Sequence, residues 1–127
     1  MRAIADTSAI IGVEAGRIEA RDLRRFELSV SAITIGELEA GVACADASTW
    51  QLRARTLLQV LSALPVIAAD RQIAGAYGTV VGRLRAADAS VGYHDAWIAA
   101  TAVAEEMPVV TQDRDFLRIE GLEVVLV

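Results

Sequence analysis

The chain has 127 residues, a net charge of −5 and a hydrophobic fraction of 54%. This length suits one domain over residues 1–127 that buries roughly two-thirds of its unfolded surface, with no room for a second folded domain. No apolar run approaches the roughly 20 residues of a membrane-spanning helix, and Asp6 interrupts the N-terminus before a signal-peptide core can form. We therefore expect a cytoplasmic protein, and the acidic charge balance by itself argues against a polyanionic partner.

The N-terminal part predicts two units of strand followed by helix. A short apolar run at residues 3–5 ends at Asp6, and a helical segment begins near Ser8. Residues 28–32 form the second predicted strand. The sequence Thr34-x-x-Glu37 then matches the capping pattern that opens many helices, and apolar periodicity continues to about residue 45.

The rest of the chain repeats this alternation. Pro65 ends one apolar-periodic stretch, Asp70 is the predicted N-cap of the next, and small residues at 88–92 form a break. The predicted elements are helices over 49–64, 71–87 and about 94–105, and strands over 66–68, 108–111 and 122–126. Such alternation indicates an α/β fold with a mostly parallel sheet between layers of helices, because parallel neighbours need crossover connections.

The chain has one cysteine and no lysine. Cys44 has no partner for an internal disulfide, as expected in a reducing compartment, and its Ala/Val-rich surroundings predict a small buried side chain. The lack of lysine removes one kind of partner for a buried carboxylate.

Four acidic residues fall where a parallel sheet gathers functional side chains, in the crevice beyond the carboxyl ends of its strands. Asp6 and Asp113 directly follow predicted strands, and Glu37 falls on the predicted first turn of the helix after the second strand. Asp95 opens a helix whose same-face successors are apolar, so its carboxylate should point along the buried side. We expect the four carboxylates to share one edge of the sheet.

Converging carboxylates repel each other unless a cation lies between them, and no lysine exists to supply the charge. Hard oxygen ligands favour Mg²⁺ or Mn²⁺ over zinc. Taken singly, each acid is explained at least as well as a helix cap or as a favourable charge at a helix N-terminus. Only the shared edge distinguishes the four from acids at other breaks, such as Asp22 and Asp88.

The same residues belong to a set of motifs that occur in a fixed order along the whole chain. These motifs are Asp6-Thr7-Ser8-Ala9, Thr34-x-x-Glu37-Leu38-x-x-Gly41, His94-Asp95-Ala96-x-Ile98-Ala99 and Val110-Thr111-x-Asp113-x-Asp115-Phe116. Together they resemble the PIN-domain family, and within it the VapC toxins of bacterial toxin–antitoxin pairs. Each motif alone is weak, but their order and distances make the resemblance specific.

This resemblance implies a parallel sheet within an α/β/α sandwich, RNA cleavage that depends on one or two Mg²⁺ or Mn²⁺ ions, a homodimer, and neutralisation by a VapB-type antitoxin. Cleavage of tRNA, rRNA or mRNA, leaving 5′-phosphate and 3′-hydroxyl ends, would inhibit translation. Carried over by position, the catalytic metal ligands are Asp6, Glu37, Asp95 and Asp113, with Asp115 as an auxiliary ligand and Thr7, Ser8 and Thr111 as polar supports.

Basic side chains could contact the RNA. Arg17, Arg21, Arg24 and Arg25 would form one basic face if their stretch is helical, and the alternative is a solvated face paired with nearby acids. Arg114, beside the last motif, could contact the scissile phosphate or pair locally.

Other side chains near the motifs have two interpretations each. His94 is either a general base or a solvated residue at a helix start. Tyr93, Trp97 and Phe116 either stack on a base or pack in the core or at a subunit interface.

Other classes of acidic α/β protein do not fit this sequence. A receiver domain needs a lysine near its acids, a P-loop NTPase needs its glycine-lysine motif, and Asp-Thr-Ser is not the Asp-x-Asp of a haloacid-type phosphatase. The remaining alternative is an inactive protein of the same fold, whose acids bind a structural cation while apolar helices engage a partner. Metal-dependent RNA cleavage that is lost on Asp→Asn substitution separates the two.

Overall fold

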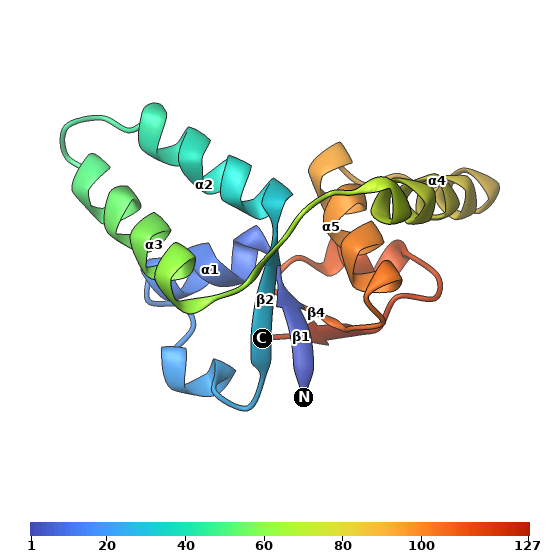
Figure 1. Ribbon diagram of the computed structural model, residues 1–127, viewed down its shortest axis with the longest axis horizontal. Coiled ribbons are helices and arrows are strands. Elements are labelled where there is room, and N and C mark those ends of the chain that lie inside the picture. The colour runs from blue at the N-terminus through green and yellow to red at the C-terminus, as the bar shows by residue number, and fades with distance from the viewer.

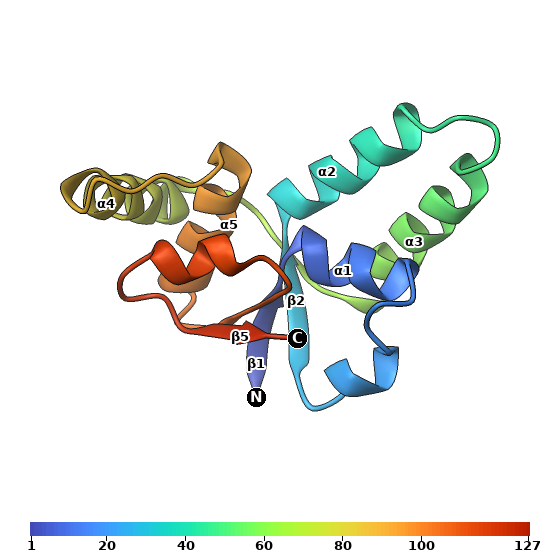
Figure 2. The same cartoon turned by 180° about the vertical axis from the view of Figure 1, so that it is seen from behind.

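A parallel sheet with helices on both faces forms the computed structural model of this protein, which describes residues 1–127 (Figures 1 and 2). The strands are β1 (Arg2–Ala5), β2 (Glu27–Ser31), β3 (Val66–Ile67), β4 (Val109–Thr111) and β5 (Val124–Leu126). The helices are α1 (Thr7–Glu14), α2 (Ala32–Ala43), α3 (Trp50–Ala63), α4 (Arg71–Ala86) and α5 (Tyr93–Ala104), with 3-10 segments η1 (Ala20–Leu23) and η2 (Arg114–Arg118). The predicted α/β/α arrangement is confirmed.

The first strand of the chain is the central strand of the sheet, whose order is β3-β2-β1-β4-β5. Ala3 of β1 lies opposite Leu28 of β2, and Ile4 lies opposite Val109 of β4. All four strand pairs are parallel. The carboxyl ends of the strands therefore share one edge, where α1, α2 and η2 begin.

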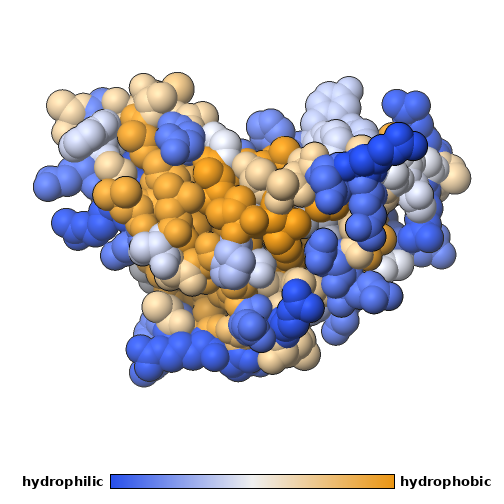
Figure 3. All heavy atoms as spheres, in the orientation of Figure 1, coloured by the Kyte–Doolittle hydropathy of each residue, from blue (hydrophilic) through white to orange (hydrophobic).

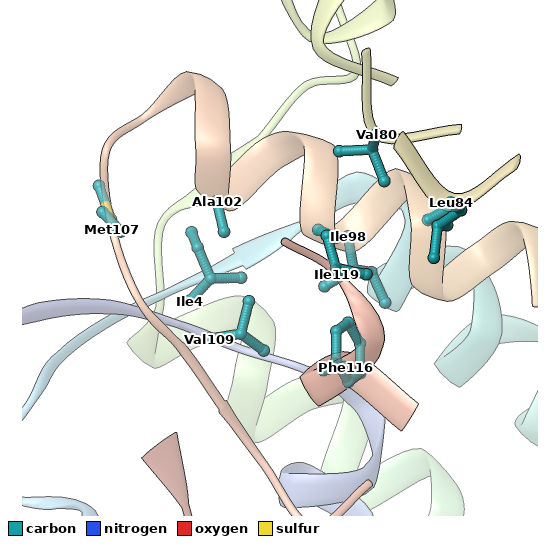
Figure 4. Packing of buried hydrophobic residues seen from close by; sticks show 11 residues of the cluster. Ile4, Val80, Leu84, Ile98, Ala102, Met107, Val109, Phe116 and Ile119 are labelled. Atoms are coloured by element: carbon teal, nitrogen blue, oxygen red, sulfur yellow. The ribbon is translucent and has the colours of Figure 1, made fainter. Parts of the chain in front are cut away.

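The core is divided between the two faces of the sheet by the alternation of strand side chains. Ile4 and Val109 point to one face and pack with Ile98 of α5 and Phe116 of η2 (Figure 4). On the other face Ala5 packs beneath α1, α2 and α3. Burial on both faces explains why the central strands are short apolar runs rather than alternating ones.

The start of α2 differs from the prediction. Its N-cap is Ser31, whose hydroxyl accepts a hydrogen bond from the Ile33 amide at 3.1 Å. Thr34 is therefore not a cap but a buried residue inside the helix, and Glu37 lies on the second turn rather than the first. The predicted N-cap Asp70 of α4 is confirmed, because its carboxylate accepts from the Ile73 amide at 3.0 Å.

The arginine-rich segment after α1 is not an α-helix, so the helical spacing of its arginines does not apply. Gly16 adopts a positive φ of 76° directly after α1, a conformation that commonly ends helices, and only the short 3-10 segment η1 follows. Cys44 is exposed rather than buried, because it caps the C-terminus of α2. None of the helices combines the length and apolar character that spanning a bilayer requires.

Candidate metal-binding site

Asp6 occupies the turn between the central strand and α1, where it is the N-cap of the helix. Its carboxylate accepts hydrogen bonds from the Ala9 amide at 3.0 Å, from Ser8 Oγ at 2.9 Å and from Thr111 Oγ1 at 2.8 Å. The residue is only 2% exposed. Burial raises the pKa of Asp6, and these hydrogen bonds oppose that rise.

Two hydroxyl groups tie Asp6 to the turn after β4. Ser8 Oγ accepts from the Gln112 amide at 3.0 Å, and Thr111 Oγ1 accepts from the Asp113 amide at 2.8 Å. Each hydroxyl therefore donates a hydrogen bond to Asp6 and accepts one from a backbone amide of this turn. Asp113 in turn caps η2, because its Oδ1 accepts from the Asp115 amide at 2.8 Å.

Glu37 reaches the same edge from the second turn of α2. Its Oε1 accepts from Thr7 Oγ1 at 2.7 Å, and its Oε2 lies 3.4 Å from His94 Nδ1. The buried Thr34 hydroxyl lies 3.3 Å from Thr7 Oγ1 and completes this group. Sequence reasoning missed this contact because it assigned Thr34 to a cap, although Thr34 and Glu37 also have the spacing of residues on one helix face.

Asp95, on the first turn of α5, lies within electrostatic range of the other acids. Burial raises the pKa of Asp95 to about 6, and the negative charges of neighbouring carboxylates add to the rise. Those carboxylates belong to Asp113, Asp6, Glu37 and Asp115. The four acids expected to share the carboxyl edge of the sheet, and the auxiliary Asp115, are therefore close enough for their charges to act on Asp95.

Little positive charge balances this cluster. Asp115 pairs with Arg118 at 3.2 Å, and Glu37 has only the largely exposed His94 beside it. The other three acids, Asp6, Asp95 and Asp113, form no salt bridge. Without a balancing cation, the mutual repulsion of these carboxylates destabilises the folded chain.

The donor set fits a hard divalent cation. As they stand, no three of these side chains form a ready-made ligand cage. Mg²⁺ does not require such a cage, because it keeps several waters and is usually held by one or two carboxylates together with substrate phosphates. Oxygen-only donors with excess negative charge are what such an ion, or Mn²⁺, prefers.

The arginines proposed as RNA contacts separate into different surfaces. Arg17, Arg21 and Arg25 line one surface hollow, whereas Arg24 lines another between α1, β2 and α3. The condition for one shared basic face is not met, since the segment is not an α-helix. Arg21 pairs with Glu19 at 2.7 Å, and Arg114 is exposed beside the acidic cluster without a salt bridge.

The aromatic residues near the motifs mostly pack within the molecule. Phe116 is fully buried in the core, and Trp97 stacks on Tyr77 with ring centroids 4.2 Å apart. Tyr93 remains 79% exposed at the start of α5. Packing is therefore the correct interpretation for Phe116 and Trp97, and Tyr93 alone stays free to contact a ligand.

Comparison with known proteins decides the family. The chain matches the PIN domain over residues 3–122. Ribonuclease VapC4 of Mycobacterium tuberculosis is 36% identical over 126 residues, which cover 99% of this chain and 97% of that protein. The chain is a PIN domain of the VapC family.

Solved structures share the fold of this PIN domain along its whole length. VapBC from Salmonella typhimurium, solved bound to DNA, has a TM-score of 0.86 and 26% identity, covering 99% of this chain and 98% of that chain. VapBC-5 from Mycobacterium tuberculosis, a member of the VapBC family of toxin-antitoxin systems, has a TM-score of 0.83 and 26% identity over 99% of this chain and 97% of that chain. The family resemblance read from the four motifs is confirmed.

Proposed function

We propose that this PIN domain is a Mg²⁺- or Mn²⁺-dependent endoribonuclease that acts as the toxin of a VapBC-type pair. One observation supports metal-dependent cleavage. The charges of four other carboxylates help to raise the pKa of Asp95, while Asp6, Asp95 and Asp113 form no salt bridge in the chain. The ribonuclease name of the VapC4 relative supports RNA as the substrate.

In this proposal the metal ligands are Asp6, Glu37, Asp95 and Asp113, with Asp115 as an auxiliary ligand. When bound, a divalent ion would acidify a water molecule and stabilise negative charge on the phosphate. The chain supplies the orientation of its own carboxylates. Ser8 and Thr111 hold Asp6 in one position, and Thr7 holds one oxygen of Glu37.

The partners follow from the names of the relatives and from the exposed apolar surface. Figure 3 shows a broad apolar area over α2 and α3, and Trp50, Leu58 and Leu61 of α3 are exposed. A hollow of about 620 Å³ lies between α1, β2 and α3 and is lined mainly by apolar side chains. Such surface suits a VapB-type antitoxin and a second copy of the chain. We propose that the homodimer acts in the cytoplasm and stops translation by cutting tRNA, rRNA or mRNA.

The test exposes total RNA to the purified chain with Mg²⁺ or Mn²⁺ and maps new 5′-phosphate ends, whose partners should carry 3′-hydroxyls. Asp6→Asn and Asp95→Asn should each abolish cleavage with the fold intact, because each removes charge from the metal site while keeping side-chain shape. Asp70→Asn is the matched control, since asparagine also caps α4 and Asp70 lies outside the cluster. Full activity of either variant, or of the wild type in excess chelator, contradicts the proposal.

The same experiment decides the alternative of an inactive cation-binding interaction module. Both functions use the same carboxylates to bind the cation, so only the cleavage of RNA separates them. The alternative predicts Mn²⁺ binding that is lost in Asp95→Asn, together with no new RNA ends under any metal condition.

A further inference from the structure

Three arginines converge on a surface hollow outside the acidic cluster. Arg17, Arg21 and Arg25 line this hollow of about 490 Å³, together with Ile18, Asp22, Leu126 and Val127. The Val127 amide donates to the Thr111 carbonyl at 3.0 Å. This arginine hollow therefore lies at the carboxyl end of β5. Arg17 is the member nearest the turn that carries Asp113, whereas Arg21 and Arg25 belong to the segment that leads into the amino end of β2.

Arg17 is held at this edge by a neutral side chain. Its Nε donates to Gln112 Oε1 at 3.2 Å, and Gln112 lies between Thr111 and Asp113 in the chain. Gly12 of α1 makes room for this contact, because a Cβ there would lie 2.8 Å from Gln112 Oε1 and 2.7 Å from Ile18 Cδ1. The turn that carries Asp113 thus also positions Arg17.

The charge in the arginine hollow is only partly neutralised. Arg17 hydrogen-bonds to an amide, and the Arg25 guanidinium lies 4.7 Å from the Phe26 ring, so neither forms a salt bridge. Arg21 is paired with Glu19. Asp22, the one acid in the lining, also lies beside Arg21, with its Oδ1 3.9 Å from the Arg21 Nε. Arg17 and Arg25 therefore carry two positive charges without a salt-bridge partner, in a chain of net charge −5.

We propose that the arginine hollow binds phosphates of the RNA strand on one side of the scissile bond, and that Gln112 is the positioning residue for Arg17. This inference rests on the proposed function. The acidic cluster repels a polyphosphate strand, so the strand needs cationic contacts outside the cluster, and guanidinium groups bind phosphate with directed hydrogen bonds. The contact between Arg17 and the turn that carries Asp113 favours RNA over an acidic segment of a protein partner, because a strand cut at the acidic cluster must pass this turn.

The test measures binding of a short fluorescein-labelled single-stranded RNA of random sequence in an Asp95→Asn background, which should leave the RNA intact. Removing two phosphate contacts with Arg17→Gln and Arg25→Gln should flatten the plot of log affinity against log salt by about 1.4 and weaken binding at least about tenfold at 0.1 M salt. Arg24→Gln is the matched control: it removes the same charge from the same segment, but its side chain lines the other hollow. It should leave the salt dependence unchanged.

Two substitutions of Gln112 distinguish the effect of the position of Arg17 from the effect of its charge. Gln112→Glu turns the neutral partner of Arg17 into an ion pair and should flatten the salt dependence by about 0.7, the value for one lost contact. Gln112→Ala keeps the charge and should weaken binding with little change in slope. All these side chains except that of the partly exposed Gln112 lie on the surface, so unchanged melting temperatures should accompany the losses.

Equal slopes for the double arginine variant and its parent would overturn the inference while leaving metal-dependent cleavage by the wild type untouched. Loss of binding to poly-L-glutamate, with RNA binding retained, would identify the arginine hollow as a protein contact and would also overturn it. If the parent binds no RNA at low salt and the wild type makes no cuts, both the inference and the proposed function fail.

Discussion

The hydroxyl of Thr111 organises the acidic edge at the scale of a single residue. It donates to Asp6 and accepts from the Asp113 amide, and the residue is fully buried. Thr111→Val keeps the shape but leaves a buried carboxylate and a buried amide short of a partner. We expect a loss of about 1–3 kcal/mol in the free energy of unfolding, measured by urea denaturation without metal.

Thr101 offers a matched control for that substitution. It is equally buried, but its hydroxyl bonds only to the Trp97 carbonyl one turn earlier in α5. That carbonyl keeps its helical hydrogen bond when the hydroxyl is removed, so Thr101→Val should cost less than about 1 kcal/mol. Equal losses for the two variants would show that the Asp6 network adds nothing to stability.

Asp95 makes the stability of the metal-free chain depend on pH. Its pKa rises from 3.8 to about 6 on folding, so the folded chain holds a proton that the unfolded chain has released between these values. The stability associated with this proton is present at about pH 4 and is lost as the pH rises through about 6. Because the side chain is partly exposed, we discount the roughly 3 kcal/mol of the full shift to about 1 kcal/mol.

Asp95→Asn should therefore raise the melting temperature of the metal-free protein at pH 7, and the gain should shrink towards pH 4. Thermal unfolding at a series of pH values checks this, with Asp70→Asn as the control substitution outside the cluster. A gain of equal size at pH 4 and pH 7 would rule out relief of carboxylate repulsion as its cause.

Helices and strands were predictable where a local pattern is long enough to have one interpretation. The apolar stretch before Pro65 and the cap at Asp70 agree with the helices found, because these signals depend on neighbours in sequence. The Thr34-x-x-Glu37 pattern misled because the same spacing fits both a capping pair and two residues on one helix face. The arginine spacing after α1 misled because Gly16 ends the helix before that spacing can matter.

Two helical glycines differ in what surrounds them, and this difference is testable at the scale of an element. A Cβ on Gly78 of α4 meets nothing within 4 Å, so Gly78→Ala should raise the free energy of unfolding by about 0.5–1 kcal/mol. A Cβ on Gly12 of α1 collides with the Ile18 and Gln112 side chains. Gly12→Ala should give no such gain, and chemical denaturation of both variants measures the contrast.

A divalent cation should stabilise the whole molecule if the acidic cluster binds it. Binding to the folded chain alone adds about 2.7 kcal/mol when the free ion is at 100 times its Kd. Mn²⁺ should therefore raise the melting temperature at pH 7, and the effect should fall below about pH 6 because the ion must displace the Asp95 proton. An equal rise in Asp95→Asn would show that the ion binds elsewhere.

The assembly of the site was predictable from sequence only through general properties of parallel sheets. Asp6 and Asp113 could be assigned to one edge because both follow strands, and strands of a parallel sheet end together. The contacts between distant residues were not predictable, such as Thr7 with Glu37 or Arg17 with Gln112. They depend on strand order and on helix orientation, which local patterns do not encode.

The central position of β1 also sets the order in which the acidic edge of the sheet is completed during synthesis. The ribosome makes this strand first, yet one of its two neighbours, β4, emerges only after residue 109. Asp6 is thus among the earliest residues translated, while Thr111, which donates to it, and Asp113 are among the last. If the acidic cluster is the cutting site proposed above, a nascent or truncated chain would carry only part of that site, and cleavage would begin only after nearly all of the chain has been made.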